Sequence, residues 1–379
     1  MRVLITGANG FIGKNLQLFL RERRDTQVVC YHRGNEPGQL VNMLGGVDFV
    51  FHLAGVNRPQ DPAEFTTGNA DLTKALCAAV TAVAEAENRK IPILHTSSTQ
   101  AAQDNPYGRS KREAEAVLAS TGRHPLVPVH VFRLPNVFGK WCRPHYNSAV
   151  ATFCHNIARD LPIEVHNPQA PLSLVYIDDV VNRFVQIMDG AEPMIGPDGF
   201  SSVQPQYTAS VGELAQLLRA FRTSRDTLLT ERVGTGLVRA LYATYVSYLP
   251  VEAFAYGLSG HVDRRGMFVE MLKTKDSGQF SYFTAHPGIT RGGHYHHSKT
   301  EKFLVIRGKA CFRFRQIVSG EFYELFTDGE QPEIVETVPG WTHDITNVGD
   351  EEMIVMLWAN EIFDREHPDT FTRPVGTEA

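Results

Sequence analysis

The stretch Gly288–Gly308, GITRGGHYHHSKTEKFLVIRG, combines three histidines and a glutamate with an apolar run that has the character of a β-strand. One residue separates His294 from His296, and alternate residues of a strand point to the same face. Glu301 can return to the same spot across a hairpin. These three side chains are therefore predicted to converge on a single atom.

A second histidine-bearing stretch, Pro339–Asn347 (PGWTHDITN), follows later in the chain, and its His343 would add a ligand from another strand. Three imidazoles and a carboxylate suit a divalent metal, with Zn²⁺ favoured. The spacing G-x5-H-x-H-x4-E-x6-G, with the later glycine, histidine and asparagine, resembles the cupin family. The resemblance implies an all-β jelly-roll barrel, as do the short strand-like segments from about Val262 onward. Whether the histidines hold a metal or shuttle protons themselves stays open.

Bulk properties exclude several classes of protein. A chain of 379 residues is too long for one core and predicts about two or three domains. A net charge of -5 gives no reason to expect nucleic acid or a membrane surface. The five scattered cysteines suit a reducing compartment, and no segment approaches the ~18 apolar residues of a membrane span. The apolar run at the N-terminus breaks at Gly7, unlike a secretion signal, so we predict a cytoplasmic protein.

The N-terminal part alternates between strand-like and helix-like segments. Arg2–Thr6 reads as a buried strand, and Gly7–Gly13 as a glycine turn that opens a helix. Further strands are expected at Gln27–Tyr31, Val47–Leu53, Ile91–His95 and Val127–Arg133. This alternation predicts a Rossmann-type, doubly wound parallel sheet, in which the helix N-terminus can bind a pyrophosphate.

The spacing G-x-x-G-x-x-G, together with Tyr107-x-x-x-Lys111, resembles the extended short-chain dehydrogenase/reductase family from residue 1 to about 245. The resemblance implies that Tyr107 and Lys111 are catalytic, and that Ser98 binds a substrate carbonyl, with Ser97 as a possible stand-in. One helical turn separates the tyrosine from the lysine, so we expect the ammonium to lower the pKa of the phenol. The cofactor-binding residues implied by the resemblance are Gly7, Gly10, Phe11, Ile12, Gly13, His32, Arg33, Leu53, Ala54, Gly55, Asn69, Tyr107 and Lys111.

The end of the second strand indicates which cofactor is bound. An acidic side chain there would bind the ribose 2′-hydroxyl of NAD, but no acid occurs before Glu36. Arg33 and His32 can instead meet a 2′-phosphate. We therefore predict NADPH, and with it a net reduction.

Around Asn136, the sequence RLPNVFG continues the family pattern, and the resemblance suggests that this residue binds a nucleotide sugar. Lys140, Arg143 and Asn147 follow closely and are suitable partners for a diphosphate. For each of these three residues, an ordinary surface position is an equally good interpretation.

The two parts together predict a reductase domain at 1–248, a linker at 249–261 and a cupin domain at 262–379. Arg291–His296 is similar to the R-G-x-H-x-H of cupins that isomerise or epimerise nucleotide-linked 4-keto sugars. The whole resembles bifunctional capsule and O-antigen enzymes of the UDP-N-acetyl-L-fucosamine route. That resemblance implies C3 epimerisation of a UDP-2-acetamido-2,6-dideoxy-4-keto-hexose, followed by reduction to UDP-2-acetamido-2,6-dideoxy-β-L-talose. His297 and Lys302 are candidate acid/base groups, with solvated strand residues as the alternative.

Two other hypotheses remain open. In the first hypothesis, the chain is a single-activity reductase and the barrel is a binding and dimerisation module. In the second, the chain is a non-enzymatic NADP-sensing protein. A homodimer is expected by analogy with both families. The partner we predict is a UDP-linked 4-keto amino sugar, with no nucleic acid and no membrane insertion.

Overall fold

The computed structural model describes residues 1–32, 34–36, 38–57, 61, 64–258, 260–263, 266–269, 272–274, 278–361 and 366–376. Contacts divide the chain into two compact units. The first comprises Met1–Ser148 and Leu172–Thr208, and the second comprises Ala149–Pro171 and Ala209–Ala379. Within the described residues, no helix combines the length and the apolar character needed to cross a membrane.

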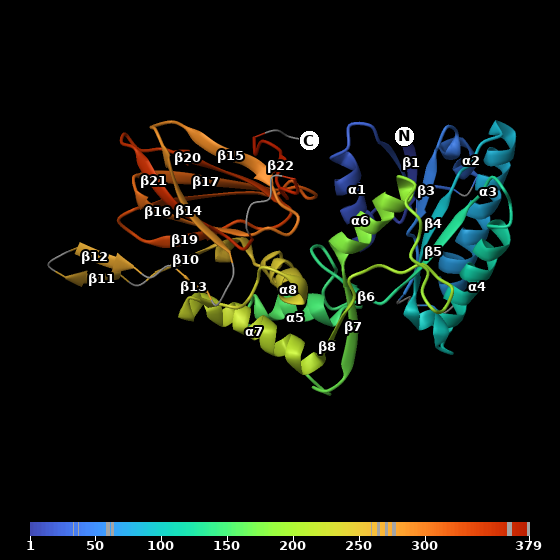
Figure 1. Cartoon of the computed structure of the whole chain (residues 1–379), viewed down its shortest axis with the longest axis horizontal. Coiled ribbons are helices and arrows are strands. Elements are labelled where there is room, and N and C mark those ends of the chain that lie inside the picture. Colours follow the sequence, from blue (N-terminus) through green and yellow to red (C-terminus); the bar gives the residue numbers. More distant parts are fainter. Residues whose placement is uncertain are drawn as a thin grey trace. The chain divides into compact units, whose positions relative to one another are not determined.

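The first unit contains a five-stranded parallel sheet in the order β2-β1-β3-β4-β5. Figure 1 shows α1 and α6 on one face of this sheet and α2, α3 and α4 on the other. The predicted Rossmann-type sheet is therefore confirmed. The strands are β1 (Arg2–Thr6), β2 (Gln27–Tyr31), β3 (Phe49–His52), β4 (Ile93–Ser98) and β5 (Val129–Leu134). The helices are α1 (Phe11–Arg21), α2 (Gln39–Leu44), η1 (Thr66–Asp71), α3 (Leu72–Glu87), η2 (Thr99–Ala102), α4 (Pro106–Thr121) and α6 (Ile177–Met188). A second sheet has the order β6-β7-β8 (Asn136–Phe138, Pro171–Tyr176, Tyr207–Ser210).

The apolar character of β1 explains its central place in the sheet. Val3, Leu4 and Ile5 have no exposed surface, because helices cover both faces of a parallel sheet. From β1 the chain leads to β2 on one side, and β3 pairs on the other. Nucleotides bind where the strand order reverses in this way, outside the carboxyl ends of the strands. That position lies at the ends of β1 and β3.

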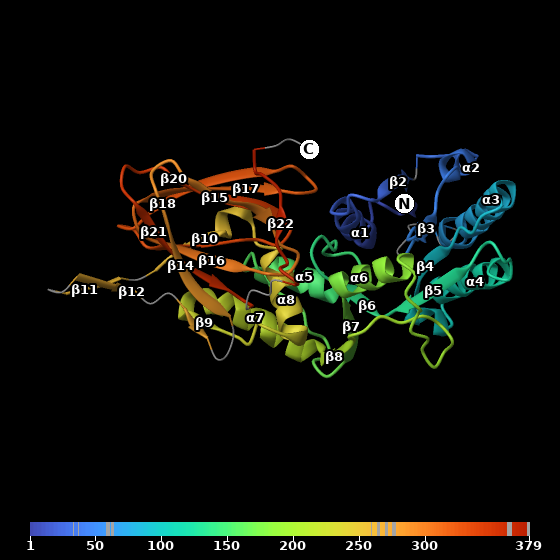
Figure 2. The ribbon, with the colours of Figure 1, turned by 45° about the horizontal axis from the view of Figure 1, so that its top comes forward.

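The second unit contains several helices and two five-stranded antiparallel sheets, in the orders β10-β19-β16-β21-β14 and β18-β17-β20-β15-β22 (Figure 2). The predicted all-β barrel is thereby confirmed. The helices are α5 (Ala149–Ile157), α7 (Val211–Thr227), α8 (Gly236–Val246) and η3 (Val251–Ala253). The sheet strands are β10 (Ala255–Gly257), β14 (Gln279–Ala285), β15 (Thr290–Tyr295), β16 (Glu301–Arg307), β17 (Lys309–Gln316), β18 (Phe322–Asp328), β19 (Glu333–Glu336), β20 (Trp341–Asn347), β21 (Met353–Ala359) and β22 (Phe371–Thr372). Short strands β9 (Leu229–Thr230) and β13 (Lys273–Thr274) pair with each other, as do β11 (Gly260–Asp263) and β12 (Gly266–Val269).

The contact-defined units divide the chain differently from the predicted domains, whose bounds stay a prediction. Helices α5, α7 and α8 fall in the second unit, although they precede residue 249. Strand β10 lies within the predicted linker and pairs with β19. Its neighbour Phe254 is fully buried and makes edge-to-face contacts with Phe314, Tyr323 and Trp341. This segment is thus an integral part of the barrel core.

Candidate active sites

The glycine turn after β1 brings the backbone against the end of β3. Gly7 has φ of +70°, and a Cβ there would lie 2.6 Å from the amide nitrogen of Ala54. The amide of Gly10 donates to Gly7 O at 2.9 Å, and a Cβ on Gly13 would lie 2.3 Å from that same oxygen. Only glycine tolerates these approaches. The turn ends at the N-terminus of α1, which no described side chain caps, so its first N–H groups can meet a phosphate.

Asn69 connects three segments beside this turn. The amide of Val56 donates to its Oδ1 at 2.8 Å, and its Nδ2 donates to Val56 O and Ser110 Oγ, both at 3.0 Å. A Cβ on Gly55 would lie 3.1 Å from both Asn69 Oδ1 and Lys111 Nζ. The structure thus brings three predicted site residues together: Gly55, Asn69 and Lys111.

Tyr107 and Lys111 lie one turn apart in α4, and Ser98 is the last residue of β4. Tyr107 shares a side-chain hydrogen bond with Ser98, and Lys111 Nζ lies 6.0 Å from the centre of the tyrosine ring. Ser97 instead donates to Glu115 Oε1 at 2.6 Å. Ser98, rather than Ser97, is therefore the serine that accompanies the tyrosine.

Burial governs the ionisation of this pair. It lowers the pKa of Lys111 to about 8, and the ammonium donates to the carbonyl of Thr96 at 3.1 Å. Burial raises the pKa of Tyr107, and the hydrogen bond with Ser98 offsets part of this rise. The expectation that Lys111 would lower the pKa of the phenol is not met, because desolvation is the largest influence on Tyr107.

The end of β2 is only partly described. His32 is exposed, and its amide donates to Asn35 Oδ1 at 2.7 Å. Arg33, the predicted partner of a 2′-phosphate, lies outside the described residues. The choice of NADPH therefore stays a prediction.

The predicted diphosphate-binding residues have different surroundings. Arg143 and Asn147 are exposed, and the Arg143 guanidinium lies 5.3 Å from the centre of the Tyr146 ring. Lys140 is only 1% exposed and donates to Asp178 Oδ1 at 2.7 Å. Because this buried ion pair already neutralises its charge, the structure does not place Lys140 where a diphosphate can reach it.

The loop after β6 lies close to Tyr107. Asn136 begins β6 and is exposed, with its side-chain amide bound to the backbone of β7. Beyond it, Trp141 (φ 68°) and His145 (φ 55°) adopt left-handed backbone conformations that are strained for non-glycine residues. The next residue, Tyr146, acts electrostatically on Tyr107. Our sequence analysis passed over Tyr146, since no motif marks it.

In the second unit, the four predicted metal ligands converge. His294 lies in β15, His296 follows that strand, Glu301 begins β16 and His343 lies in β20. One ligand atom from each of these residues lies within 4.8 Å of all the others. Glu301 Oε2 lies 3.2 Å from His296 Nε2 and 3.6 Å from His343 Nε2. Antiparallel pairing of β15 with β20 sets His294 opposite His343.

The hydrogen bonds and the burial of these histidines are compatible with a bound cation. His296 Nδ1 lies 2.6 Å from the backbone carbonyl of Asp369, which can only accept, so Nδ1 carries a proton. Nε2 of the same ring lies 3.2 Å from Glu301 Oε2, within hydrogen-bond distance, so it can either donate a proton to the carboxylate or share a bound cation with it. Burial lowers the pKa of His294 to about 3 and also lowers that of His343. Neutral imidazoles with a carboxylate are the donor set of Zn²⁺, so these residues fit a divalent metal.

Asp369 organises the loop that carries His296. Its carboxylate accepts from the amides of His297, Ser298 and Lys299 at 2.9, 2.9 and 2.7 Å. Its own φ is 31°, a left-handed value. Since Asp369 is distant from the histidines in sequence and belongs to no motif, our sequence analysis missed it.

We expect Asp369→Ala to weaken Zn²⁺ binding by about 10- to 100-fold, because it frees the loop that orients His296. Competition with a chromogenic chelator measures this affinity. Asp350→Ala, which removes an exposed carboxylate from a turn of the barrel, is the matched control. Equal affinities in the two variants would refute a role for Asp369.

The two predicted acid/base groups do not join the cluster. The His297 ring packs against Tyr295 and Phe371, with ring centres 5.6 and 4.8 Å apart. Lys302 follows Glu301 in β16 and therefore points to the opposite face of the strand. Lys302 is 2% exposed and forms a buried ion pair with Glu336. The structure thus places Lys302 in an ion pair away from the cluster, and its acid/base role stays a prediction.

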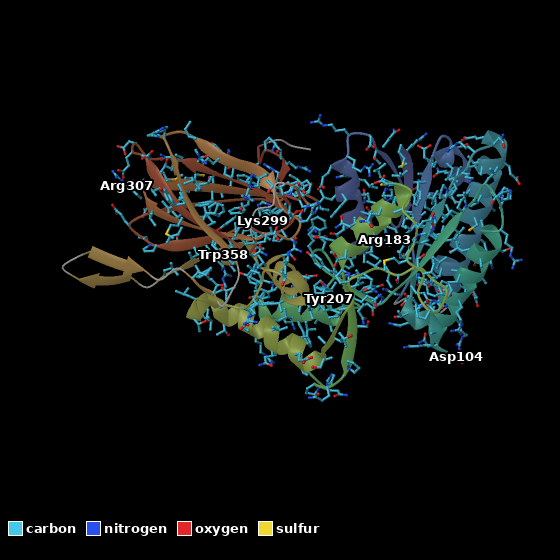
Figure 3. The ribbon with its side chains drawn as sticks, in the orientation of Figure 1. Asp104, Arg183, Tyr207, Lys299, Arg307 and Trp358 are labelled. Carbon is cyan, nitrogen blue, oxygen red and sulfur yellow. The ribbon has the colours of Figure 1, made fainter. Side chains whose placement is uncertain are left out.

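Lys299 is the lysine that does reach the cluster. It is 7% exposed, and its Nζ lies 3.7 Å from Glu301 Oε1 and 3.0 Å from Thr370 Oγ1 (labelled in Figure 3). The ion pair holds the charge of this lysine beside the carboxylate. The sequence pattern pointed to Lys302, because it directly follows Glu301, and no motif marks Lys299.

We expect Lys302→Met to destabilise the second unit by about 3 kcal/mol, because Glu336 loses one of two buried cationic partners. The other partner is Arg225, whose Nη2 lies 3.1 Å from Glu336 Oε2. Urea unfolding measures the loss, with the exposed Lys309→Met as control. A fully stable Lys302→Met protein without barrel activity would restore a catalytic role for Lys302.

Comparisons with known proteins agree with this two-part organisation. Residues 3–198 match the NAD dependent epimerase/dehydratase family, and residues 261–371 match the polysaccharide biosynthesis C-terminal domain. Over 379 residues and the full length of both chains, the protein is 60% identical to a UDP-2-acetamido-2,6-beta-L-arabino-hexul-4-ose reductase from Pseudomonas aeruginosa.

Solved structures show the same pattern. The capsular polysaccharide assembling protein CapF from Staphylococcus aureus is 40% identical, with a TM-score of 0.67, and the match covers 99% of this chain and 100% of that one. A UDP-glucuronic acid 4-epimerase from Bacillus cereus, solved with NAD, shares only the fold: it is 20% identical, with a TM-score of 0.50, over 57% of this chain and 83% of that one. The chain belongs to the NAD dependent epimerase/dehydratase family.

Proposed function

We propose that the chain is a bifunctional nucleotide-sugar enzyme. Its barrel epimerises C3 of a UDP-2-acetamido-2,6-dideoxy-4-keto-hexose. Its Rossmann-type unit then reduces the C4 ketone with NADPH, giving UDP-2-acetamido-2,6-dideoxy-β-L-talose. The observation that carries this proposal is the presence, in one chain, of the Tyr107, Ser98 and Lys111 site and the four-residue His/Glu cluster. The full-length likeness to a reductase of a UDP-linked hexul-4-ose supports it.

The reductase half follows from the hydrogen bond between Ser98 and Tyr107. A ketone oxygen held between these two hydroxyls would be polarised towards hydride attack at C4. NADPH, held at the glycine turn of Gly7–Gly13, would supply the hydride for this carbon, and its oxidation to NADP⁺ would match the reduction of the sugar. The phenol gives its proton to the developing alkoxide, which balances the reaction. Lys111 keeps a positive charge close to the phenol.

The epimerase half depends on the acidity that a C4 ketone confers on the hydrogen at C3. A divalent metal, when bound, would supply a Lewis acid for the carbonyl oxygen. His294, His296, Glu301 and His343 would hold it. Loss of the C3 proton and its return to the opposite face invert this carbon. When the imidazoles hold the metal, the ammonium of Lys299 is the group beside them that can return a proton; in a cluster without metal the imidazoles themselves can carry it.

Product analysis tests both halves together. The UDP-4-keto substrate is supplied with NADPH, loss of nicotinamide absorbance is followed, and the configuration of the product is read by NMR. The proposal predicts one NADPH consumed for each talo-configured product. A product reduced at C4 but not inverted at C3 would indicate a single-activity reductase. A complete lack of NADPH consumption would favour an NADP-sensing protein. We also propose that the protein acts in the cytoplasm as a homodimer.

A further inference from the structure

Three side chains form a buried network behind the catalytic lysine. Glu115 of α4 is 6% exposed, and its carboxylate receives three hydrogen bonds. Ser97 Oγ of β4 donates to Oε1 at 2.6 Å. The guanidinium of Arg133, in β5, donates from Nε to Oε1 at 2.9 Å and from Nη2 to Oε2 at 2.7 Å. Such a two-pronged contact fixes both the position and the orientation of a carboxylate.

Two members of this network lie beside the proposed catalytic residues. Glu115 lies four residues after Lys111 on α4, so the two side chains share a helix face, and the carboxylate acts electrostatically on the ammonium. Ser97 directly precedes Ser98, the serine that hydrogen-bonds Tyr107. The network therefore fixes a carboxylate on the helix face that carries the lysine, and it anchors the strand end that carries the serine.

Among the described groups that face Lys111, Glu115 is the carboxylate. Within α4 they are Tyr107 and Glu115, and from β3 and β4 they are His52 and His95. Burial lowers the pKa of His52 to about 3 and that of His95 well below its usual value, so both rings are neutral near pH 7. Burial of the lysine itself favours loss of its proton. Among the described groups that act on Lys111, Glu115 opposes this loss through its charge, and the carbonyl of Thr96 accepts a hydrogen bond from the ammonium.

We propose that Glu115, clamped by Ser97 and Arg133, is a positioning residue that keeps Lys111 in its ammonium form beside Tyr107. This inference rests on the proposed reductase function. The lysine must stay charged for reduction, so activity falls as pH rises through the range where Lys111 loses its proton. Removing the carboxylate moves this alkaline limit to lower pH.

The pH dependence of kcat/KM for NADPH oxidation tests the inference in the full-length enzyme. We expect Glu115→Gln to shift the alkaline limb downward by about one pH unit, because a neighbouring opposite charge changes a pKa by that order. Glu115→Asp keeps the charge and should return the limb towards that of the unchanged protein. Glu113→Gln, which removes an exposed carboxylate from the same helix, should leave it unmoved. A limb that Glu115→Gln does not shift, with activity lowered equally at every pH, would overturn the inference.

A second readout separates this inference from the proposed function. Lysines labelled with ¹³C at Cε are titrated by NMR in the folded protein, and the Lys111 signal is identified by its loss in Lys111→Met. We expect Glu115→Gln to lower the titration midpoint of that signal. A lowered midpoint without any NADPH oxidation would refute the reductase and keep the role of Glu115. NADPH oxidation together with an unchanged Lys111 titration midpoint would support the reductase and refute the role of Glu115. If the Glu115→Gln protein does not fold, the Glu115→Asp protein decides. Aspartate keeps the negative charge, so a Lys111 titration midpoint that moves by more than one pH unit in Glu115→Asp would contradict an action through charge.

Discussion

Tyr107→Phe is expected to slow NADPH oxidation by the 4-keto substrate by about 10²- to 10⁴-fold, the usual contribution of a positioned proton donor. The variant loses the hydroxyl that bonds Ser98, but keeps the ring that packs against Phe65, with ring centres 5.9 Å apart. Stopped-flow absorbance of the nicotinamide measures the rate.

The same variant should keep full activity in the barrel, because Tyr107 and the His/Glu cluster belong to different compact units. Exchange of the C3 hydrogen with solvent deuterium measures that activity. Tyr282→Phe, at a position 71% exposed, is the control for removal of a phenol. If Tyr107→Phe oxidised NADPH at the unchanged rate, the proposed proton donor would be wrong.

Glu301→Gln is expected to produce the opposite pattern. The substitution keeps the shape of the side chain but removes the negative charge that lies 3.2 Å from His296 Nε2 and 3.7 Å from Lys299 Nζ. We expect exchange at C3 to fall at least about 100-fold, together with affinity for Zn²⁺. Reduction of a substrate already inverted at C3 should proceed normally.

Glu321→Gln supplies the matched control, because Glu321 is an exposed carboxylate in the same barrel. Thermal unfolding shows whether the variants remain folded. Unchanged exchange in folded Glu301→Gln would show that the cluster takes no part in epimerisation. Loss of both activities would point to coupling between the two reactions, contrary to the independent sites proposed here.

Much of the fold was predictable because local pattern and tertiary structure agree. The apolar run at Arg2–Thr6 became the central strand β1, and a Cβ added at Gly7 or Gly13 in the following turn would lie only 2.6 or 2.3 Å from backbone atoms, so no side chain fits there. In the barrel, the spacing of His294, His296 and Glu301 predicted convergence, and the ligand atoms do meet. In both cases the constraint lies within a short segment, so the sequence records it.

Other features depend on residues that are far apart in the chain. Pairing of β22 with β15 brings Asp369 to the loop of His296, and no sequence motif predicts this pairing. Lys302 was a plausible acid/base group by its position next to Glu301, but alternation along β16 turns it towards Glu336. Lys140 likewise has a buried partner, Asp178, in a helix that begins much later. Contacts of this kind join residues that are distant in the sequence, so no local sequence pattern predicts them.

The central claim is that the imidazole cluster makes the carbon next to the ketone exchange its proton before any reduction. The most direct test places the full-length protein and the UDP-4-keto substrate in D₂O without NADPH, and follows the substrate by mass spectrometry and NMR. The account predicts one deuterium at C3 and a second, inverted isomer, with no loss of nicotinamide absorbance in a parallel sample that receives NADPH but no sugar. A substrate that stays undeuterated at C3, while added NADPH is still consumed, would contradict it.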